Sequence, residues 1–324
     1  MNIIDAHMHV VGDHPDTLTF LKNMNLKLLN ICVAENNAIW RKQEREPYQK
    51  LAQQHPEHYA WCTTFDLPTF EPDYVERVVE GLERDFREAA VACKVWKNIG
   101  MEVKKPGGEI LMVDDPLFEP IFSYLARAGK PLLMHIAEPL ACWRSLNEES
   151  PHRAYYENNP EWHMYGRKDM PSHEALIACR DNVVARHPEL RIIGAHLGSL
   201  EYDVDEVARR LDRYPNFAVD ISARLGDLMC QDGEKVRAFF TNYQDRILFG
   251  TDVVMREPHS SLPAEERARQ ISELDKLYND HFRYFETDQK VSHRGCTTNG
   301  VHLADEVLEK FYYGNARAWY SLEA

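Results

Sequence analysis

Short apolar runs recur along the whole chain, and each stops at a polar residue. Buried parallel strands are continuously apolar, so we interpret eight of these runs as strands. They are Ile3–His9, Lys27–Val33, Tyr59–Phe65, Ala90–Trp96, Pro131–Ile136, Arg191–His196, Phe217–Ser222 and Ile247–Asp252. Apolar residues at helical spacing lie between them, in Thr17–Met24, Tyr48–His55, Asp73–Glu88, Pro116–Ala128, His173–His187, Asp203–Tyr214, Gly233–Tyr243 and Asp305–Trp319. This alternation predicts the α/β class and a single (β/α)8 TIM-barrel domain over residues 1–324.

Two connections are longer than the ~2–6 residues that usually join a strand to a helix. One runs from Ala137 to about Ser172, after the fifth strand, and the other from Val253 to about Ala304, after the eighth. Both follow strands with reactive ends, so both should cover the active face. We expect Trp143 and Tyr165 of the first connection to contact substrate. Packing and oligomer contact are the alternative roles for such aromatic residues, and for the second connection the sequence favours no role.

The ends of these strands carry side chains that bind metals or move protons. His7 and His9 belong to the first strand, and the later strands end in or contain Lys94, His135, His196 and Asp252. In a parallel barrel the carboxyl ends of all strands meet at one face, so these groups can converge there. His7 and His9 are two residues apart and should point to the same side, where two imidazoles make half of a zinc site. The same alternation places Asp5 on that side and Ile4, Ala6 and Met8 against the helices.

Five segments together carry a resemblance to a known family. They are Asp5-Ala6-His7-Met8-His9, Met134-His135, Gly194-Ala195-His196-Leu197-Gly198, Leu248-Phe249-Gly250-Thr251-Asp252 and Tyr313-Gly314-Asn315-Ala316. In this order they resemble the amidohydrolase superfamily of metal-dependent (β/α)8 enzymes. The closest likeness is to its amidohydrolase-related branch, which also holds aminocarboxymuconate-semialdehyde-type decarboxylases.

The resemblance implies one divalent ion, Zn²⁺, held by His7, His9, His135 and Asp252. Water activated by the ion would attack an ester, lactone or amide of a small, carboxylate-bearing substrate. Asp252 would move the proton, with His196 and Lys94 stabilising the oxyanion. The alternative in the same branch is a non-oxidative decarboxylase, in which His196 or Asp252 protonates carbon. A second arrangement of the site has two ions, with a carbamylated Lys94 as the bridge and His196 on the second ion.

Three further residues are candidates for the wall of the site. Arg224 follows the seventh strand and suits bidentate recognition of a substrate carboxylate. Glu138 lies three residues after His135, at the start of the long connection. A surface ion pair is the alternative role for both residues. Lys97 is a weaker candidate, and solvation is its alternative.

Composition limits the classes of partner and the cellular location that we expect for this protein. The net charge of −14 disfavours nucleic acid and anionic membranes, since both need a basic face. We expect a small-molecule substrate, and self-association into a homo-oligomer is compatible with this sequence. Seven cysteines without a Cys-x-x-Cys pair indicate a reducing compartment. The first strand begins at residue 3, which leaves no room for a signal peptide, so the expected location is the cytoplasm.

Overall fold

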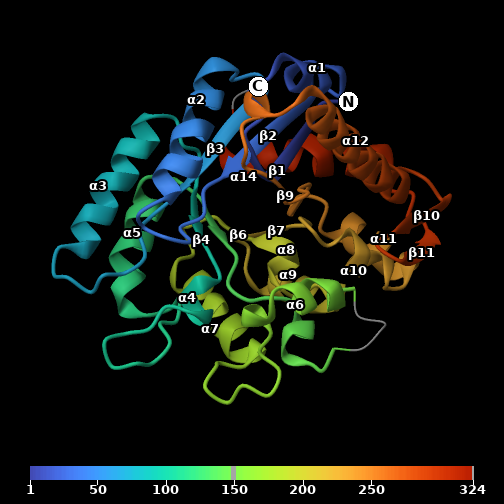
Figure 1. Ribbon diagram of the computed structural model, residues 1–324. Coiled ribbons are helices and arrows are strands. Elements are labelled where there is room, and N and C mark those ends of the chain that lie inside the picture. The colour runs from blue at the N-terminus through green and yellow to red at the C-terminus, as the bar shows by residue number, and fades with distance from the viewer. Residues whose placement is uncertain (147–150, 323–324) are drawn as a thin grey trace.

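A nine-stranded parallel sheet forms the centre of the molecule (Figure 1). The computed structural model describes residues 1–146 and 151–322. In sheet order the strands run β8-β7-β6-β5-β4-β3-β2-β1-β9. Their bounds are β1 (Ile3–Val10), β2 (Leu26–Ile31), β3 (Tyr59–Thr64), β4 (Cys93–Val95), β5 (Leu132–Met134), β6 (Ile192–Gly194), β7 (Phe217–Asp220), β8 (Ile247–Leu248) and β9 (Val253–Met255).

The segment that contains β8 and β9 joins the two edges of this sheet. β8 pairs with β7, and β9 pairs with β1. Between them the Ala6 amide donates to Phe249 O (2.9 Å) and the Asp252 amide to His7 O (2.8 Å). A Cβ on Gly250 would lie 3.1 Å from His7 Cβ, so a glycine lets the segment come this close to β1. The sheet closes on itself, and the predicted (β/α)8 barrel is confirmed.

Helices cover the outside of the barrel. Figure 1 shows α2, α3 and α5 along one side of the sheet and α10, α11 and α12 along the opposite side. The bounds are α1 (Pro15–Asn23), α2 (Glu46–Gln54), α3 (Tyr74–Arg87), α4 (Asn98–Met101), α5 (Glu119–Arg127), α6 (Arg153–Asn158), α7 (His173–Arg186), α8 (Ala195–Gly198), α9 (Val204–Arg213), α10 (Leu225–Met229), α11 (Gly233–Asn242), α12 (Ala264–Glu286), α13 (Asp305–Glu309) and α14 (Asn315–Tyr320). Within the described residues no helix is both long and apolar enough to cross a membrane.

Both long connections are present, and both contain regular structure. The first holds α6 and two short 3-10 turns. The second holds α12, a helix of 23 residues, and a hairpin of β10 (Lys290–His293) and β11 (Cys296–Asn299). The sequence pattern did not reveal α12. Its buried face is a narrow stripe that includes Leu274, Tyr278, His281 and Phe285, and charged residues occupy most of the other positions.

The interior of the barrel is filled by small and branched side chains. This inner layer includes Ile4, Ala6, Leu29, Ile31, Ala60, Cys62, Ala92, Leu133, Ile193, Ala218 and Leu248, with Ala316, Tyr320 and Leu322 from the end of the chain. A separate and larger apolar layer packs the outer faces of the strands against the helices. At β4, β5, β7 and β8, a polar residue or glycine stands two places after a residue of the inner layer. These residues are Lys94, His135, Asp220 and Gly250. The alternation that fills the barrel therefore also directs polar side chains toward its mouth.

The orientation predicted for the first strand is wrong for Asp5, Ile4 and Ala6. A β-bulge lies between Asp5 and Met8, and it reverses the parity of the strand. Ile4 and Ala6 therefore belong to the inner layer, while Asp5 points outward and accepts a hydrogen bond from Tyr278 of α12 (2.9 Å). After the bulge His7 and His9 point inward, and Met8 faces outward as expected. A one-residue shift moves every side chain to the other face, and no periodicity in the sequence reports it.

Candidate metal centre and active site

One cavity of about 520 Å³ lies at the carboxyl ends of the strands. Six predicted residues line it, and we call them the strand-end cluster: His7, His9, Lys94, His135, His196 and Asp252. The volume is in the range of small-molecule sites, which span ~300–1,000 Å³. Five members of the cluster are buried, and the Asp252 side chain alone is partly exposed, at 26%.

His7 is held in one tautomer by a buried carboxylate. Its Nδ1–H donates to Asp220 Oδ2 (2.8 Å), because an ionised carboxylate can only accept. The lone pair on Nε2 therefore faces the cavity. An outer carboxylate that orients an imidazole in this way is characteristic of metal-binding histidines. Burial lowers the pKa of His7, which favours the neutral form that a metal ligand needs.

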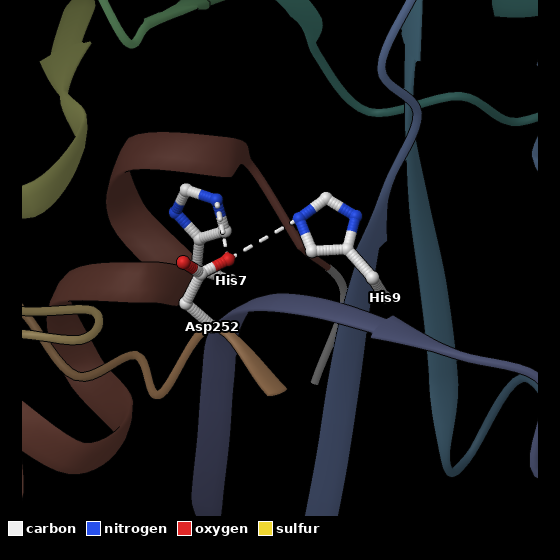
Figure 2. A group of neighbouring side chains, drawn as sticks. All are labelled: His7, His9 and Asp252. Carbon is white, nitrogen blue, oxygen red and sulfur yellow. Dashed lines mark ion pairs between the residues drawn. The ribbon is translucent and has the colours of Figure 1, made fainter. Parts of the chain in front are cut away.

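Asp252 brings two of the histidines together (Figure 2). Its Oδ1 lies 3.4 Å from His9 Nε2 and 3.7 Å from His7 Nε2. One ligand atom from each of these three residues lies within 4.8 Å of the other two. Burial would raise the pKa of Asp252, but the hydrogen bond from His9 and the nearby imidazoles lower it well below its usual value. The carboxylate is therefore available as a charged ligand or as a base.

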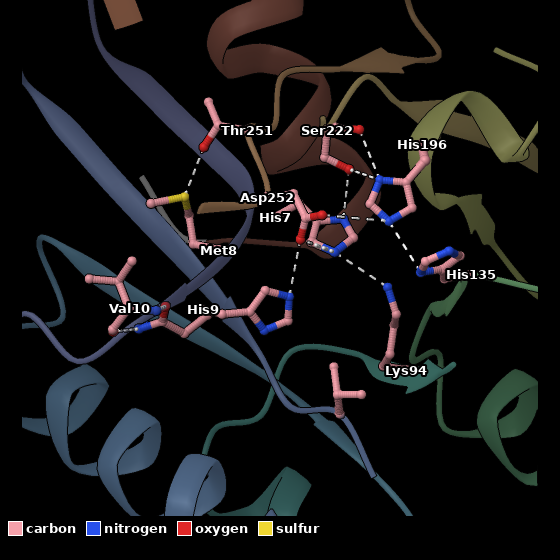
Figure 3. Close-up of polar contacts among 12 residues, drawn as sticks. His7, Met8, His9, Val10, Lys94, His135, His196, Ser222, Thr251 and Asp252 are labelled. Carbon is pink, nitrogen blue, oxygen red and sulfur yellow. Dashed lines mark hydrogen bonds and ion pairs between the residues drawn. The ribbon is translucent and has the colours of Figure 1, made fainter. Parts of the chain in front are cut away.

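His196 and His135 form a chain of hydrogen bonds beside this group (Figure 3). His196 Nδ1–H donates to the Ser222 carbonyl (2.8 Å), so its Nε2 can accept from His135 Nδ1 (3.2 Å). This leaves the His135 Nε2 lone pair buried and without a partner among the described residues. His196 Nε2 also lies 4.0 Å from Asp252 Oδ2. Burial lowers the pKa of both histidines well below the ordinary value, so both are neutral.

Lys94 is a buried cation at the centre of the site. Its Nζ lies 3.4 Å from His7 Nε2, and the side chain is about 1% exposed. Burial lowers its pKa to about 8. The fourth strand places Lys94 inward, two residues after Ala92 of the inner layer. This burial excludes the alternative that Lys94 is an ordinary solvent-exposed lysine.

Asp220 and Ser222, which are outside the predicted set, hold the histidines of the cluster in position. Asp220 accepts from His7 Nδ1, from the His196 amide (2.9 Å) and from the Ser222 hydroxyl (2.5 Å). Although burial raises the pKa of Asp220, the interaction with His7 and the hydrogen bond that it donates hold the pKa well below its usual range. Asp220 also forms a second compact group with His7 and His196. We assign it to orientation rather than ligation, because its oxygens are already used by these donors.

The backbone is strained where three of these strands end. His196, Ala223 and Asp252 have φ values of 59°, 57° and 62°, in the left-handed region that favours glycine. Such conformations cost of order 1–3 kcal/mol each and concentrate at functional sites. They turn the chain at the ends of β6, β7 and β8.

Arg224, Glu138 and Lys97 all line the cavity. Arg224 is 7% exposed, its Nη1 donates to Ala223 O (3.1 Å), and its Nε has no partner among the described residues. Glu138 forms a buried ion pair with Lys97 and accepts from the Tyr156 hydroxyl (3.0 Å). Lys97 is therefore not solvated: its Nζ lies 3.9 Å from the centroid of the Trp162 ring and 3.3 Å from the Tyr155 hydroxyl.

The aromatic residues that reach the cavity are not the two that the sequence indicated. Trp96 and Tyr155 line it, whereas Trp143 and Tyr165 do not. Trp143 donates from Nε1 to Pro171 O (2.9 Å) and packs on His173, on the far side of the connection. Tyr165 is 57% exposed. The path of a long loop decides which of its side chains face inward, and the sequence has no period that encodes it. We call Trp96, Lys97, Glu138 and Tyr155 the loop wall.

The second long connection also contributes to the cavity. The sequence had favoured no role for this connection. Leu277 and His281 of α12 and His293 and Arg294 of the hairpin line its edge. His281 Nδ1–H donates to Leu277 O (2.8 Å), so its Nε2 is an acceptor, and it has no partner among the described residues. Burial lowers the pKa of His281 to about 4.

The donor set fits a divalent cation. His7, His9 and Asp252 offer two imidazole nitrogens and one carboxylate oxygen in a compact group, and the orphan His135 Nε2 belongs to the same cavity. Imidazole and carboxylate are the ligands of catalytic zinc sites. A closed parallel barrel with such a group at its mouth defines a metal-dependent barrel enzyme.

The chain belongs to the amidohydrolase family. The sequence profile of that family, described as amidohydrolase, matches residues 4–322. This confirms the resemblance inferred from the motifs and makes the protein an enzyme of the amidohydrolase superfamily. No curated protein matches the sequence.

Solved structures share the fold at low sequence identity. The 2,6-dihydroxybenzoate decarboxylase from Rhizobium is similar over 100% of both chains, with 17% identity and a TM-score of 0.57. A probable 2-pyrone-4,6-dicarboxylic acid hydrolase from Acinetobacter baumannii has 9% identity and a TM-score of 0.52, over 99% of this chain and 100% of its own. A 4-oxalomesaconate hydratase from Rhodopseudomonas palustris has 12% identity and a TM-score of 0.55, over 98% and 95%. At these identities the likeness shows the fold alone.

Proposed function

We propose that this protein is a metal-dependent hydrolase that cleaves an ester, lactone or amide of a small, carboxylate-bearing substrate. The observation that carries the proposal is the position of Asp252. Its carboxylate is the one partly exposed group of the strand-end cluster, and it lies between the imidazoles of His7 and His9 on one side and His196 on the other. A base in that position can reach a water molecule in the cavity.

The residues that would hold the ion are His7, His9 and Asp252, with His135 as the further ligand. We favour one ion of the Zn²⁺ type, because the set combines imidazole nitrogens with a single carboxylate. When bound, such an ion supplies Lewis acidity and makes water acidic enough to lose a proton near neutral pH.

The protein's own groups then divide the remaining work. Asp252 takes a proton from water and returns it to the leaving group. His196 Nε2 lies 4.0 Å from Asp252 Oδ2 and serves as the acid–base partner, since its Nδ1–H is fixed on the Ser222 carbonyl. The ammonium of Lys94 stabilises the developing oxyanion.

Arg224 supports a carboxylate-bearing substrate. Its guanidinium is buried at the cavity edge, and its Nε lacks a hydrogen-bond partner among the described residues. A substrate carboxylate would supply the missing acceptor and pair with the charge. Lys97, by contrast, already forms a direct ion pair with Glu138. The charges of Asp227 and Glu201 act on Arg224 at longer range.

A decarboxylase is the second candidate, and the composition of the cavity wall favours it. Trp96 and Tyr155 of the loop wall line the same cavity as Arg224, and flat aromatic side chains suit a planar aromatic acid. One structural neighbour is a 2,6-dihydroxybenzoate decarboxylase. In this case His196 or Asp252 would protonate the carbon that loses its carboxyl group.

Incubation in ¹⁸O-labelled water separates the two reactions. Metal-loaded enzyme is screened with lactones, esters, amides and aromatic carboxylic acids, and products are followed by mass spectrometry. Hydrolysis places one labelled oxygen in the product, whereas decarboxylation replaces a carboxyl group by hydrogen and releases carbon dioxide. We expect the labelled carboxylate. Carbon dioxide release without label in the organic product would replace the hydrolase by the decarboxylase.

Asp252→Asn tests the assigned base on the substrate so identified. It should keep most of the metal and lose about 10²–10⁴-fold in kcat, the usual contribution of general base catalysis. Lys94→Met should lose activity and keep one ion per chain. Loss of metal from Lys94→Met would support the carbamylated bridge and two ions instead.

A further inference from the structure

Two cysteines from different parts of the chain lie side by side near the rim of the cavity. Cys230 directly follows α10, Cys296 begins β11, and α10 packs against β11. Their thiols are close enough to share a hydrogen bond. Cys230 is exposed and Cys296 is half-buried, so both can be reached from solvent, whereas Cys32, Cys62, Cys93 and Cys142 are buried.

We propose that Cys230 and Cys296 are a modification site that forms a reversible disulfide when the protein meets a small-molecule disulfide such as oxidised glutathione. The sulfur of one cysteine attacks the glutathione disulfide, and a glutathione thiol leaves. The second cysteine then attacks the mixed disulfide and releases the second glutathione thiol. The protein loses two thiol hydrogens and two electrons, and the oxidant gains both as two molecules of reduced glutathione.

The contact between the two sulfur atoms is what makes the second step favourable. A thiol held beside a mixed disulfide reacts intramolecularly, at an effective concentration on the order of millimolar or more. Cys179 is also half-buried, but its thiol is paired with Asp114 rather than with a second cysteine. The mixed disulfide at Cys179 would therefore persist.

Either cysteine can begin the exchange. Burial raises the pKa of Cys230, and its thiol interacts with that of Cys296. The thiolate is the nucleophile in thiol–disulfide exchange, and both sulfurs can be reached from solvent, so the first attack can come from either residue and the other resolves the mixed disulfide.

The crosslink would join two edges of the cavity. The β10–β11 hairpin carries His293 and Arg294 to the cavity edge, and α10 begins directly after Arg224. A bond between Cys296 and Cys230 fixes the hairpin on α10. The disulfide therefore limits how far this part of the rim can move away from the barrel. The barrel itself does not change.

The test uses the full-length, metal-loaded protein in glutathione buffers of increasing oxidised fraction. Non-reducing peptide mapping should find the peptide of Cys230 linked to the peptide of Cys296, and reduction should remove the link. Hydrogen exchange of residues 290–299 should slow by about tenfold in the oxidised form, because the hairpin can no longer open independently. These measurements need no substrate, so their outcome does not depend on the proposed function.

Single variants provide the controls. Cys230→Ser should stop at a glutathione adduct on Cys296, whereas Cys179→Ser should form the Cys230–Cys296 link as the wild type does. Stable glutathione adducts on both Cys230 and Cys296 of the wild type, with no linked peptide, would overturn the proposal. A linked peptide that leaves hydrogen exchange in the hairpin unchanged would overturn the part of the proposal that says the disulfide restricts the rim.

Discussion

The strand-end cluster and the loop wall line one cavity but are held in different ways. In the cluster, His7 is fixed by Asp220 at the end of β7, and His196 is fixed by the Ser222 carbonyl, two residues after β7. In the loop wall Lys97 and Glu138 are fixed by each other and by aromatic rings. The barrel therefore supports the chemistry, whereas the shape of the wall depends on a few side-chain contacts.

Because of this difference, substitutions in the two regions should affect different properties of the protein. Replacing a residue of the strand-end cluster removes a ligand or a proton carrier and leaves the closed sheet intact. Replacing one partner of the Lys97–Glu138 pair leaves an uncompensated charge in a buried position. We expect the first kind of change to appear in metal content and activity, and the second in the free energy of unfolding.

The largest effect should come from His7→Ala combined with His9→Ala. Wild-type protein should carry about one divalent ion per chain, and the double variant close to none, because two of the ligands in the compact group are lost. Metal analysis after gel filtration measures this. His163→Ala is the matched control, since His163 is half-buried, does not line the cavity, and its ring nitrogen bonds to the Arg144 carbonyl (3.0 Å). Full occupancy in the double variant would show that the ion lies elsewhere.

The buried ion pair of the loop wall should give the next largest effect. Lys97→Met should lower the free energy of unfolding by about 3–5 kcal/mol, since it leaves Glu138 buried without its partner. Urea denaturation measures the loss. Replacing both residues, by Lys97→Met and Glu138→Leu, should recover part of it. The pair Lys105–Asp115, in which the lysine side chain is 39% exposed, is the control, and Lys105→Met should cost less than about 1 kcal/mol. Equal losses for the two lysines would mean that burial does not distinguish the pairs.

Glu201, which is buried outside the strand-end cluster and the loop wall, makes the free energy of unfolding depend on pH. Burial and the nearby Asp227 raise its pKa to about 7, against the lowering effects of Arg224 and His152. Because the folded pKa is raised, the protonated carboxyl favours folding at low pH, and this contribution is lost as the pH rises through about 7.

Glu201→Gln should therefore match the wild type near pH 4.5 and be more stable by about 1–3 kcal/mol above pH 7. The amide oxygen can still accept from the Leu140 amide, as the carboxylate does (2.9 Å). Urea denaturation at both pH values, with Glu189→Gln as an exposed control, measures the difference. A variant that is less stable than the wild type at high pH would indicate that the ionised form is the one the fold prefers.

The smallest effect is expected outside both regions. Tyr165→Ala should change the free energy of unfolding by no more than about 0.5 kcal/mol and leave kcat/KM unchanged, because the side chain is exposed and does not line the cavity. Steady-state kinetics on the identified substrate and urea denaturation test this. A tenfold loss in kcat/KM would show that the first connection closes over the substrate and brings Tyr165 inward.

Sequence periodicity located the members of the strand-end cluster that lie on or directly after strands. Lys94 and His135 follow the inner residues Ala92 and Leu133 at a spacing of two, so their inward direction could be read from the chain. The same rule failed for Asp5, because the β-bulge before His7 changes the parity. It also gave no indication of Asp220 as the residue that orients His7, since the hydrogen bond joins strands that are far apart in sequence.

The sequence by itself determined the barrel, the strand order and the residues of the strand-end cluster. It could do so because a strand has a period of two and because parallel strands all end at one face. Only the tertiary structure decided that Trp96 and Tyr155 rather than Trp143 and Tyr165 line the cavity, that Lys97 is buried against Glu138, and that Cys230 meets Cys296. Loops have no period, and their side chains are placed by contacts between residues that the chain brings together only after it folds.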